Sequence, residues 1–249
     1  MNSVNKTNES LMFILAGSIL ITGMMISLSI LYTGGNSKIS TNDTQNTDEE
    51  VAEQPATNIN MDIAEDDPYL GSKSKSQIAI VEFSDYECPF CKKFHTETRD
   101  QIISEYVDTE KAIVVWKDLP LPFHDPLATK QAVAAQCVNK LVGKEKYFEY
   151  GNLIFENTTS NIGMEESKLA ELAQQIDGLN QDDFNNCYTN EDTLEKVKDN
   201  MKVASEVGVD GTPGFIIGKL EDGKIVDGTR ISGALPFANF KSTIDSLLE

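Results

Sequence analysis

Two cysteines separated by two residues are the part of this 249-residue sequence best suited to chemistry. Cys88 and Cys91 enclose Pro89 and Phe90, and the segment from Asp85 onward reads DYECPFC. Proline favours the first position of a helix, because the N–H that it lacks would have no partner there, so Cys88 is expected at the N-cap. The positive end of the helix dipole would then stabilise the Cys88 thiolate and make this sulfur nucleophilic near neutral pH.

Cys91 would lie one helical turn after Cys88, on the same face. Residues three apart on a helix have β-carbons about 5–6 Å apart, so the sulfurs could form and break a bond with little backbone movement. A zinc site is one alternative, but the other two cysteines are isolated and the two histidines are far apart in the sequence. A permanent local disulfide also stays open. We therefore expect a redox pair that needs no metal and no organic cofactor.

A strand–helix–strand pattern surrounds the pair. Ile78–Phe83 (IAIVEF) and Ala112–Trp116 (AIVVW) are short apolar runs typical of buried strands. Between them, a helix is expected from Cys88 to about Val107. The prolines of Leu119–Pro126 (LPLPFHDP) predict a loop.

Helical periodicity dominates the next part of the chain. Apolar residues recur at helical spacing over residues 169–176 and again over 194–207. Phe215–Ile217 and Lys224–Val226 are candidate strands. A last helix is expected to begin at Pro236, with its apolar residues on one face.

The start of the chain has a different composition. Residues 11–32 form an uncharged apolar run long enough to span a bilayer, so we expect a transmembrane anchor with residues 1–10 on the cytoplasmic side. A cleaved secretory signal is the alternative. Residues 33–67 are polar and acidic, which predicts a flexible linker, and a chain starting near residue 65 is expected to fold without it. The formal net charge of −19 argues against a nucleic-acid partner, which needs a basic surface.

Three motifs resemble those of the DsbA-type thioredoxin-fold oxidoreductases: IAIVEFSDYECPFCKKF, LPLPFHDPLATKQAVAAQC and GVDGTPGFIIG. The resemblance covers residues 68–249, with the motifs in the family's order. It implies an α/β thioredoxin fold, in which helices flank a central mixed sheet and a helical subdomain is inserted at about residues 122–208. The order of strands and helices predicted above agrees with this architecture.

The resemblance also implies roles for residues outside the cysteine pair. Pro213 matches a cis-proline that faces the pair, which would leave the backbone of Thr212 free to pair with a bound peptide. Glu82 matches a buried acid that can accept the proton when Cys91 attacks a mixed disulfide, and Lys117 is its expected partner. A Glu82 side chain that faces solvent is the alternative.

One position departs from the best-known form of the family. Phe90 stands where DsbA itself has histidine, and a phenyl ring cannot place positive charge beside Cys88, so we expect a weaker oxidant. Phe90 and Pro89 are expected on the surface that meets the substrate. His95 is expected at the protein surface, and His124 either lines the rim of the site or serves only the structure of its loop.

Cys137 and Cys187 remain once Cys88 and Cys91 are assigned to each other. Both fall within the expected helical insertion. A structural disulfide between them is expected in an oxidising compartment. Two buried free thiols are the alternative.

These features predict a membrane-anchored, monomeric oxidoreductase on the extracytoplasmic side of the cell membrane. It would exchange disulfides with cysteines of unfolded secreted or surface proteins, in the direction of oxidation. Its expected partners are these substrates and a membrane reoxidase or reductase. A reductase or isomerase, and a non-catalytic peptide-binding module, are the alternatives.

Overall fold

The computed structural model describes residues 57–249; the predicted segments 1–10 and 11–32 and most of the predicted linker lie outside this range. No helix within the described range is long and apolar enough to cross a bilayer. In chain order, the elements are β1 (Ile59–Asp62), β2 (Tyr69–Leu70), β3 (Ile78–Ser84), α1 (Pro89–Glu97), α2 (Arg99–Ile102), the π-helical turn η1 (Ile103–Val107), β4 (Ala112–Asp118), the 3-10 turn η2 (Pro122–His124), α3 (Leu127–Val142), α4 (Lys144–Asn157), α5 (Ser167–Ala173), α6 (Gln181–Tyr188), α7 (Glu191–Glu206), β5 (Gly214–Glu221), β6 (Lys224–Ser232) and α8 (Phe237–Leu248).

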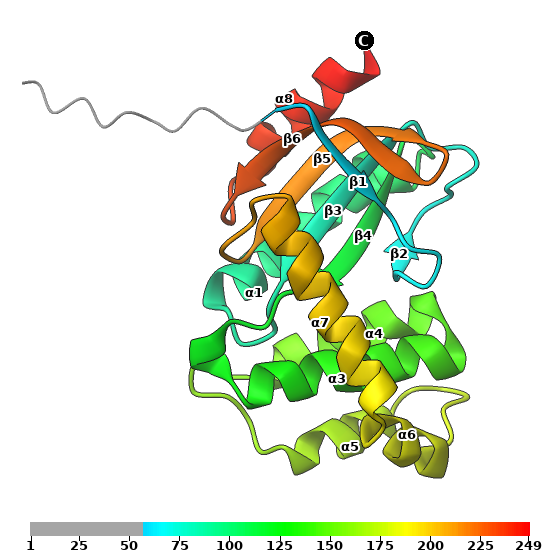
Figure 1. The fold of residues 1–249 in the computed structure, drawn as a ribbon, viewed down its shortest axis with the longest axis vertical. Coiled ribbons are helices and arrows are strands. Elements are labelled where there is room, and N and C mark those ends of the chain that lie inside the picture. The colour runs from blue at the N-terminus through cyan, green and yellow to red at the C-terminus, as the bar shows by residue number, and fades with distance from the viewer. Residues whose placement is uncertain (1–56) are drawn as a thin grey trace, which may run out of the picture. The chain divides into compact units, whose positions relative to one another are not determined.

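A mixed sheet forms the centre of the described part of the chain (Figure 1). Its strand order is β1-β6-β5-β3-β4-β2. β3 and β4 run parallel, and the other neighbouring strands are antiparallel. β3 lies inside the sheet and is buried along its whole length. Burial on both faces explains why apolar residues fill consecutive positions over Ile78–Val81 instead of alternating with polar ones.

The two faces of the sheet bury alternate residues of β3. Ile80 belongs to a core that includes Phe94 of α1 and Phe240 of α8, whose rings lie 5.4 Å apart. Val81 belongs to the core of the opposite face, with Ala204 near the end of α7. The helix that carries the cysteine pair is therefore held directly against the central strand.

Helices α3 to α7 are inserted between β4 and β5. In Figure 1, α3, α4, α5 and α6 lie together beyond one end of the sheet, and α7 runs from them back toward β5. Their core contains Tyr150 and Phe184 and continues to Cys91 and Trp116. The predicted α/β fold, with a mixed sheet and a helical insertion, is confirmed.

The folded part begins earlier than the predicted boundary at residue 68. β1 pairs with β6, and Met61 and Ile63 are buried in the core. These residues are therefore part of the folded core and not linker. The sequence signal for this strand is weak, because β1 is a short strand at the edge of the sheet with few apolar residues among polar ones.

The helix predicted from Cys88 to about Val107 is interrupted. α1 ends at Glu97, and Thr98 has φ −122°. The Thr98 hydroxyl donates to the carbonyl oxygen of Leu235 at 3.2 Å. α2 and η1 then complete the path toward β4, so a tertiary contact before α8 coincides with the break in the helix.

Candidate active site

Cys88 and Cys91 lie at the start of α1, directly after the central strand β3. Cys88 is the N-cap residue and Pro89 occupies the first turn of the helix. The N–H of Cys88 donates to the carbonyl oxygen of Asp85 at 3.1 Å. Cys88 is 4% exposed and Cys91 is 0% exposed, so an incoming sulfur can reach only Cys88. Both are free thiols, and the structure therefore represents the reduced pair.

The two thiols differ in acidity. A hydrogen bond with the Cys91 side chain does most to lower the pKa of Cys88, which falls to about 6 although burial opposes the shift. Thr212 and the backbone N–H groups of Cys91 and Phe90 lower this pKa further, as expected for a sulfur at a helix N-terminus. Burial raises the pKa of Cys91 well above its ordinary value, and the neighbouring Cys88 adds to the rise. At neutral pH, Cys88 is therefore the thiolate and Cys91 the thiol.

The segment before β5 faces this pair. The peptide bond between Thr212 and Pro213 is cis. The carbonyl oxygen of Thr212 lies 3.3 Å from Cys88 Sγ. Pro213 is buried, and its carbonyl oxygen accepts a hydrogen bond from the N–H of Gly233 at 2.8 Å. The fold thus brings a residue 124 positions away in sequence beside the sulfur of Cys88.

Glu82 is buried near the pair, and its partner is a histidine. It is 1% exposed, and its Oε1 lies 3.3 Å from Nε2 of His95. Arg99 Nη1 donates to Nδ1 of His95 at 2.7 Å, so Nε2 carries the ring proton and donates to the Glu82 carboxylate. Burial lowers the pKa of His95, in keeping with a neutral ring. The predicted surface position of His95 was wrong, because this residue lies four after Cys91 and shares its inward face of α1.

Lys117 does not pair with Glu82. In the parallel ladder of β3 and β4, Lys117 lies opposite Phe83 and Glu82 lies opposite Trp116. The two charged side chains therefore point to opposite faces of the sheet. Lys117 Nζ instead donates to the buried carboxylate of Asp67 at 2.7 Å. Asp67 belongs to the segment predicted as linker, so nothing in the sequence indicates that it pairs with Lys117.

A second polar cluster, which the sequence reasoning missed, lies beside the redox pair. Asp85 Oδ2 accepts a hydrogen bond from the N–H of Leu121 at 2.8 Å and lies 2.7 Å from Nδ1 of His124. On the other side of the imidazole ring, Nε2 lies 2.9 Å from Oδ1 of Asn161. Burial opposes charging of the ring, yet the hydrogen bonds to Asp85 and Asn161 raise the pKa of His124. Asp85 lies in the motif DYECPFC and His124 in the proline loop, so the sequence analysis named both segments. Nothing in the sequence indicates that these two residues lie beside Asn161.

Neither polar cluster forms a metal centre. Among residues 57–249, no three His, Cys, Asp or Glu side chains are placed so that they could hold a metal ion together. The chemistry that the site offers lies in its two sulfurs and in the groups that set their protonation.

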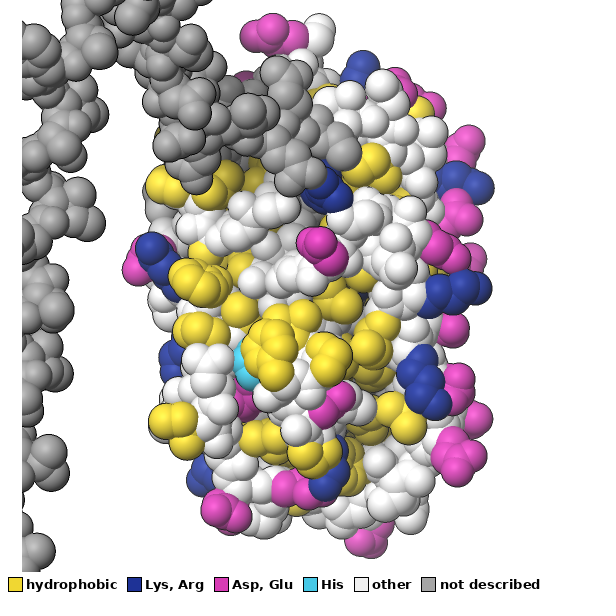
Figure 2. All heavy atoms as spheres, turned by 60° about the vertical axis from the view of Figure 1, so that its left-hand side comes forward, with side chains coloured by type: hydrophobic (Ala, Val, Ile, Leu, Met, Phe, Trp, Pro, Cys, Tyr) yellow, Lys and Arg dark blue, Asp and Glu magenta, His cyan; other side chains and the backbone are white. Residues whose placement is uncertain are grey.

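Large apolar side chains surround the site. Phe90, Phe123 and Ile162 are 61%, 75% and 89% exposed. They come from three distant segments of the chain, and the segment of Ile162 is tied to the turn before α1 by the N–H of Asn161, which donates to the carbonyl oxygen of Glu87 at 2.9 Å. Figure 2 brings the α1 side of the molecule forward and shows hydrophobic side chains gathered there around a histidine.

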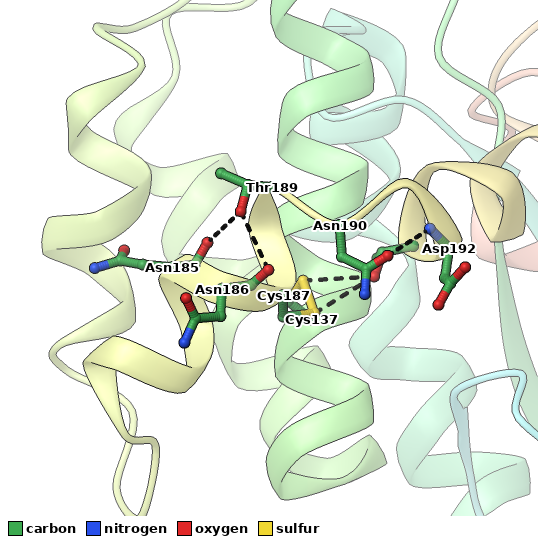
Figure 3. The surroundings of a disulfide bond; sticks show 8 residues. Cys137, Asn185, Asn186, Cys187, Thr189, Asn190 and Asp192 are labelled. Atoms are coloured by element: carbon green, nitrogen blue, oxygen red, sulfur yellow. Dashed lines mark hydrogen bonds between the residues drawn. A yellow bond between two sulfur atoms is a disulfide. The ribbon is translucent and has the colours of Figure 1, made fainter.

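Cys137 and Cys187 form a disulfide far from the redox pair in the sequence (Figure 3). The bond joins α3 to α6 and closes a loop with a sequence separation of 50. Thr193 Oγ1 lies 3.4 Å from the Cys187 sulfur, at the start of α7. The bridge thus connects helices at the beginning and near the end of the insertion.

The chain is similar to proteins of known family. Residues 64–246 match the model of the thioredoxin family. A protein of Rickettsia typhi that carries the provisional name protein-disulfide oxidoreductase is 24% identical over 197 residues, which make up 76% of this chain and 68% of that protein. In four further Rickettsia proteins with the same kind of name, the match spans 57–64% of their length, less than two thirds.

Solved structures show the same fold. α-DsbA1 of Wolbachia pipientis superposes with a TM-score of 0.63 at 23% identity, over 74% of this chain and 92% of that one. Oxidised BdbD from Bacillus subtilis superposes with a TM-score of 0.64 at 18% identity, over 78% of this chain and 98% of that one.

Proposed function

Because this chain belongs to the thioredoxin family and is a DsbA-like protein-disulfide oxidoreductase, we propose that it oxidises cysteine pairs in unfolded secreted or surface proteins through Cys88 and Cys91. One observation carries this proposal. A thiol with a pKa lowered to about 6 caps a helix, next to a buried thiol of raised pKa and beside the Thr212–Pro213 peptide. Such a pair combines one nucleophilic or attackable sulfur with one shielded sulfur that resolves the mixed disulfide.

The oxidative reaction consists of two exchanges. A substrate thiolate attacks Cys88 Sγ of the Cys88–Cys91 disulfide; the bond to Cys91 breaks, and Cys91 leaves with the electron pair and takes up a proton. A second substrate thiolate then attacks the substrate sulfur of the mixed disulfide, and Cys88 leaves as a thiolate. The substrate loses two electrons and gains a disulfide, while the enzyme ends as a thiolate at Cys88 and a thiol at Cys91. These are the protonation states that the pKa values above favour.

Glu82 and Thr212 have supporting roles in this scheme. In the reverse exchange, Cys91 must lose its proton before it can attack the mixed disulfide, and the buried carboxylate of Glu82 is the acceptor we propose. The charge on Glu82 also contributes to the raised pKa of Cys91, which supports their proximity. The Thr212 backbone, beside Cys88 and next to Pro213, would pair with the extended substrate chain.

The substrate would bind to the apolar surface around Cys88, formed by Phe90, Phe123 and Ile162, with Pro89 at its edge. Unfolded proteins differ from folded ones in exposing large apolar side chains. Covering one such side chain on each partner gains roughly 1.5–3 kcal/mol when burial is complete. Three exposed apolar residues on one rim therefore favour unfolded substrates over folded ones.

The acidity of Cys88 favours oxidation of the substrate. A stabilised thiolate stabilises the reduced enzyme, and a disulfide whose reduced form is stable is a strong oxidant. Phe90 lacks the charge of a histidine at that position. We therefore expect a reduction potential between about −270 mV, the value of thioredoxin, and about −120 mV, the value of DsbA.

We further propose that residues 11–32 anchor a monomeric enzyme in the cell membrane, with the folded part outside the cytoplasm. The uncharged apolar run supports the anchor. The Cys137–Cys187 disulfide supports an oxidising compartment. A membrane-bound oxidant that accepts two electrons from the reduced pair is the partner needed for turnover.

Disulfide formation in a reduced, unfolded test protein would test the function. Full-length oxidised enzyme should accelerate it, Cys88→Ser should abolish the effect, and Cys91→Ser should accumulate a mixed disulfide with an oxidised substrate. Acceleration of insulin reduction without oxidation of the test protein would establish the reductase alternative. Protection of an unfolded protein from aggregation that persists in Cys88→Ser, without exchange in the wild type, would establish the peptide-binding alternative.

A further inference from the structure

The imidazole ring of His124 lies between two hydrogen-bond acceptors. Nδ1 is 2.7 Å from the carboxylate of Asp85, and Nε2 is 2.9 Å from the side-chain carbonyl oxygen of Asn161. A neutral imidazole has one N–H, whereas the imidazolium has two. With the amide oxygen of Asn161 facing Nε2, only the positively charged ring can donate to both neighbours. His95 shows the contrast, because Arg99 donates to one of its nitrogens and leaves that ring neutral.

Further hydrogen bonds hold the residues that supply the two acceptors. Burial raises the pKa of Asp85, but hydrogen bonds from His124 and from the N–H groups of Leu121 and Glu87 oppose that rise. Both carboxyl oxygens of Asp85 therefore accept hydrogen bonds, and we assign Asp85 as an ionised carboxylate. Asn161 is held through its own N–H, which donates to the carbonyl oxygen of Glu87 at 2.9 Å. The hydrogen bonds to Asp85 and Asn161 therefore favour the charged form of the ring.

The cluster is built onto the turn that presents Cys88. The carbonyl oxygen of Asp85 accepts the N–H of Cys88, and Asn161 is bonded to the residue that precedes Cys88. Burial lowers the pKa of His124, the hydrogen bonds to Asp85 and Asn161 do most to raise it, and the charges of Asp85 and Cys88 raise it further. The carboxylate of the adjacent Asp125 is instead engaged by Thr129. Electrostatic coupling is reciprocal, so the same interaction stabilises the thiolate.

We propose that His124 is a fixed cation that stabilises the Cys88 thiolate and thereby raises the reduction potential, with Asp85 and Asn161 as positioning residues. The inference rests on the role proposed for Cys88. Phe90 cannot supply a positive charge from within the redox pair. In this proposal His124, on the loop that leads into the inserted helices, supplies it instead. The thiolate is thus tuned by residues outside the Cys-Pro-Phe-Cys motif.

The test compares full-length variants by ultraviolet titration of the thiolate and by redox equilibrium with glutathione. His124→Gln, which is neutral, should raise the pKa of Cys88 by about 0.5–1, less than a single unopposed charge produces because Asp85 is close. For a tenfold loss of thiolate stability the potential should fall by about 30 mV. His124→Lys, which restores the charge, should recover most of both values. Asn161→Leu, which removes one acceptor, should give an intermediate pKa.

Thr158→Val is the matched control. Its hydroxyl donates to Glu87 Oε1 at 2.6 Å and helps to hold the same loop, but the substitution changes no charge near the ring. It should leave the pKa of Cys88 within error of the wild type. An unchanged pKa in His124→Gln would overturn the proposal, as would equal shifts in the Gln, Lys and Thr158→Val variants. If His124→Gln does not fold, the pKa of Cys88 in Asn161→Leu and His124→Lys, measured by the same titration, tests the proposal. Activity that survives in Cys88→Ser would refute the proposed function instead, because the titration does not depend on turnover.

Discussion

Replacing Cys88 by alanine should remove a pH-dependent part of the stability of the reduced protein. The pKa of Cys88 is lowered from an ordinary 9.0 to about 6 in the folded protein. A group whose folded pKa is depressed stabilises the fold most above its unfolded pKa, and this contribution is lost as the pH falls through the folded value. The wild type should therefore gain stability over Cys88→Ala as the pH rises from 5 toward 9.

The size of the effect follows from the two pKa values. Integrating the difference in bound protons gives almost no contribution at pH 5, about 1.4 kcal/mol at pH 7 and about 2.7 kcal/mol at pH 8. Cys91 adds no such dependence over this range, because burial keeps its pKa well above the ordinary value. The contribution is a sizeable part of a typical stability of about 5–15 kcal/mol.

Urea unfolding under reducing conditions would measure the contribution of Cys88 to the unfolding free energy. Both proteins should carry Cys137→Ala and Cys187→Ala, so that the reductant acts only on the redox pair. The difference in unfolding free energy between wild type and Cys88→Ala at pH 5, 7 and 8 reports Cys88 together with the groups coupled to it, because Cys88 also raises the pKa values of Cys91 and His124. A difference that stays constant over this range would refute the lowered pKa assigned to Cys88.

Three further predictions concern other parts of the chain. Replacing both Cys137 and Cys187 by alanine should lower the unfolding free energy by roughly 4 kcal/mol, from the closure entropy of a loop of this length, while thiol exchange at the redox pair continues; calorimetry and an exchange assay would show this, and loss of exchange in a folded variant would contradict a purely structural bridge. Phe90→His should raise the reduction potential, measured against glutathione, by adding a donor beside the thiolate; an unchanged potential would mean that this position does not act on the sulfur. A chain that starts at residue 65, after β1, should lose several kcal/mol relative to one that starts at residue 57, because buried Met61 and Ile63 are removed; equal urea midpoints would show that β1 adds nothing.

The sequence was informative wherever neighbours along the chain decide the structure. Pro89 at the start of a helix places Cys88 at the N-cap, and the spacing to Cys91 follows from one helical turn. The apolar residues of β3 predict a strand that is buried on both faces. These features depend on a few adjacent residues, and together with the order of strands and helices they were enough to predict the fold class.

The surroundings of the sulfurs were beyond sequence reasoning, because long-range pairing sets them. Shifting a strand pair by one residue reverses which side chains share a face, and this register separates Lys117 from Glu82. The protonation of each histidine depends on whether its ring meets donors or acceptors from distant segments, as Arg99 and Asn161 illustrate. The local sequence determined that a nucleophilic cysteine pair starts a helix; only the tertiary structure decided which charges lie beside it, since electrostatic interactions act through space and not along the chain.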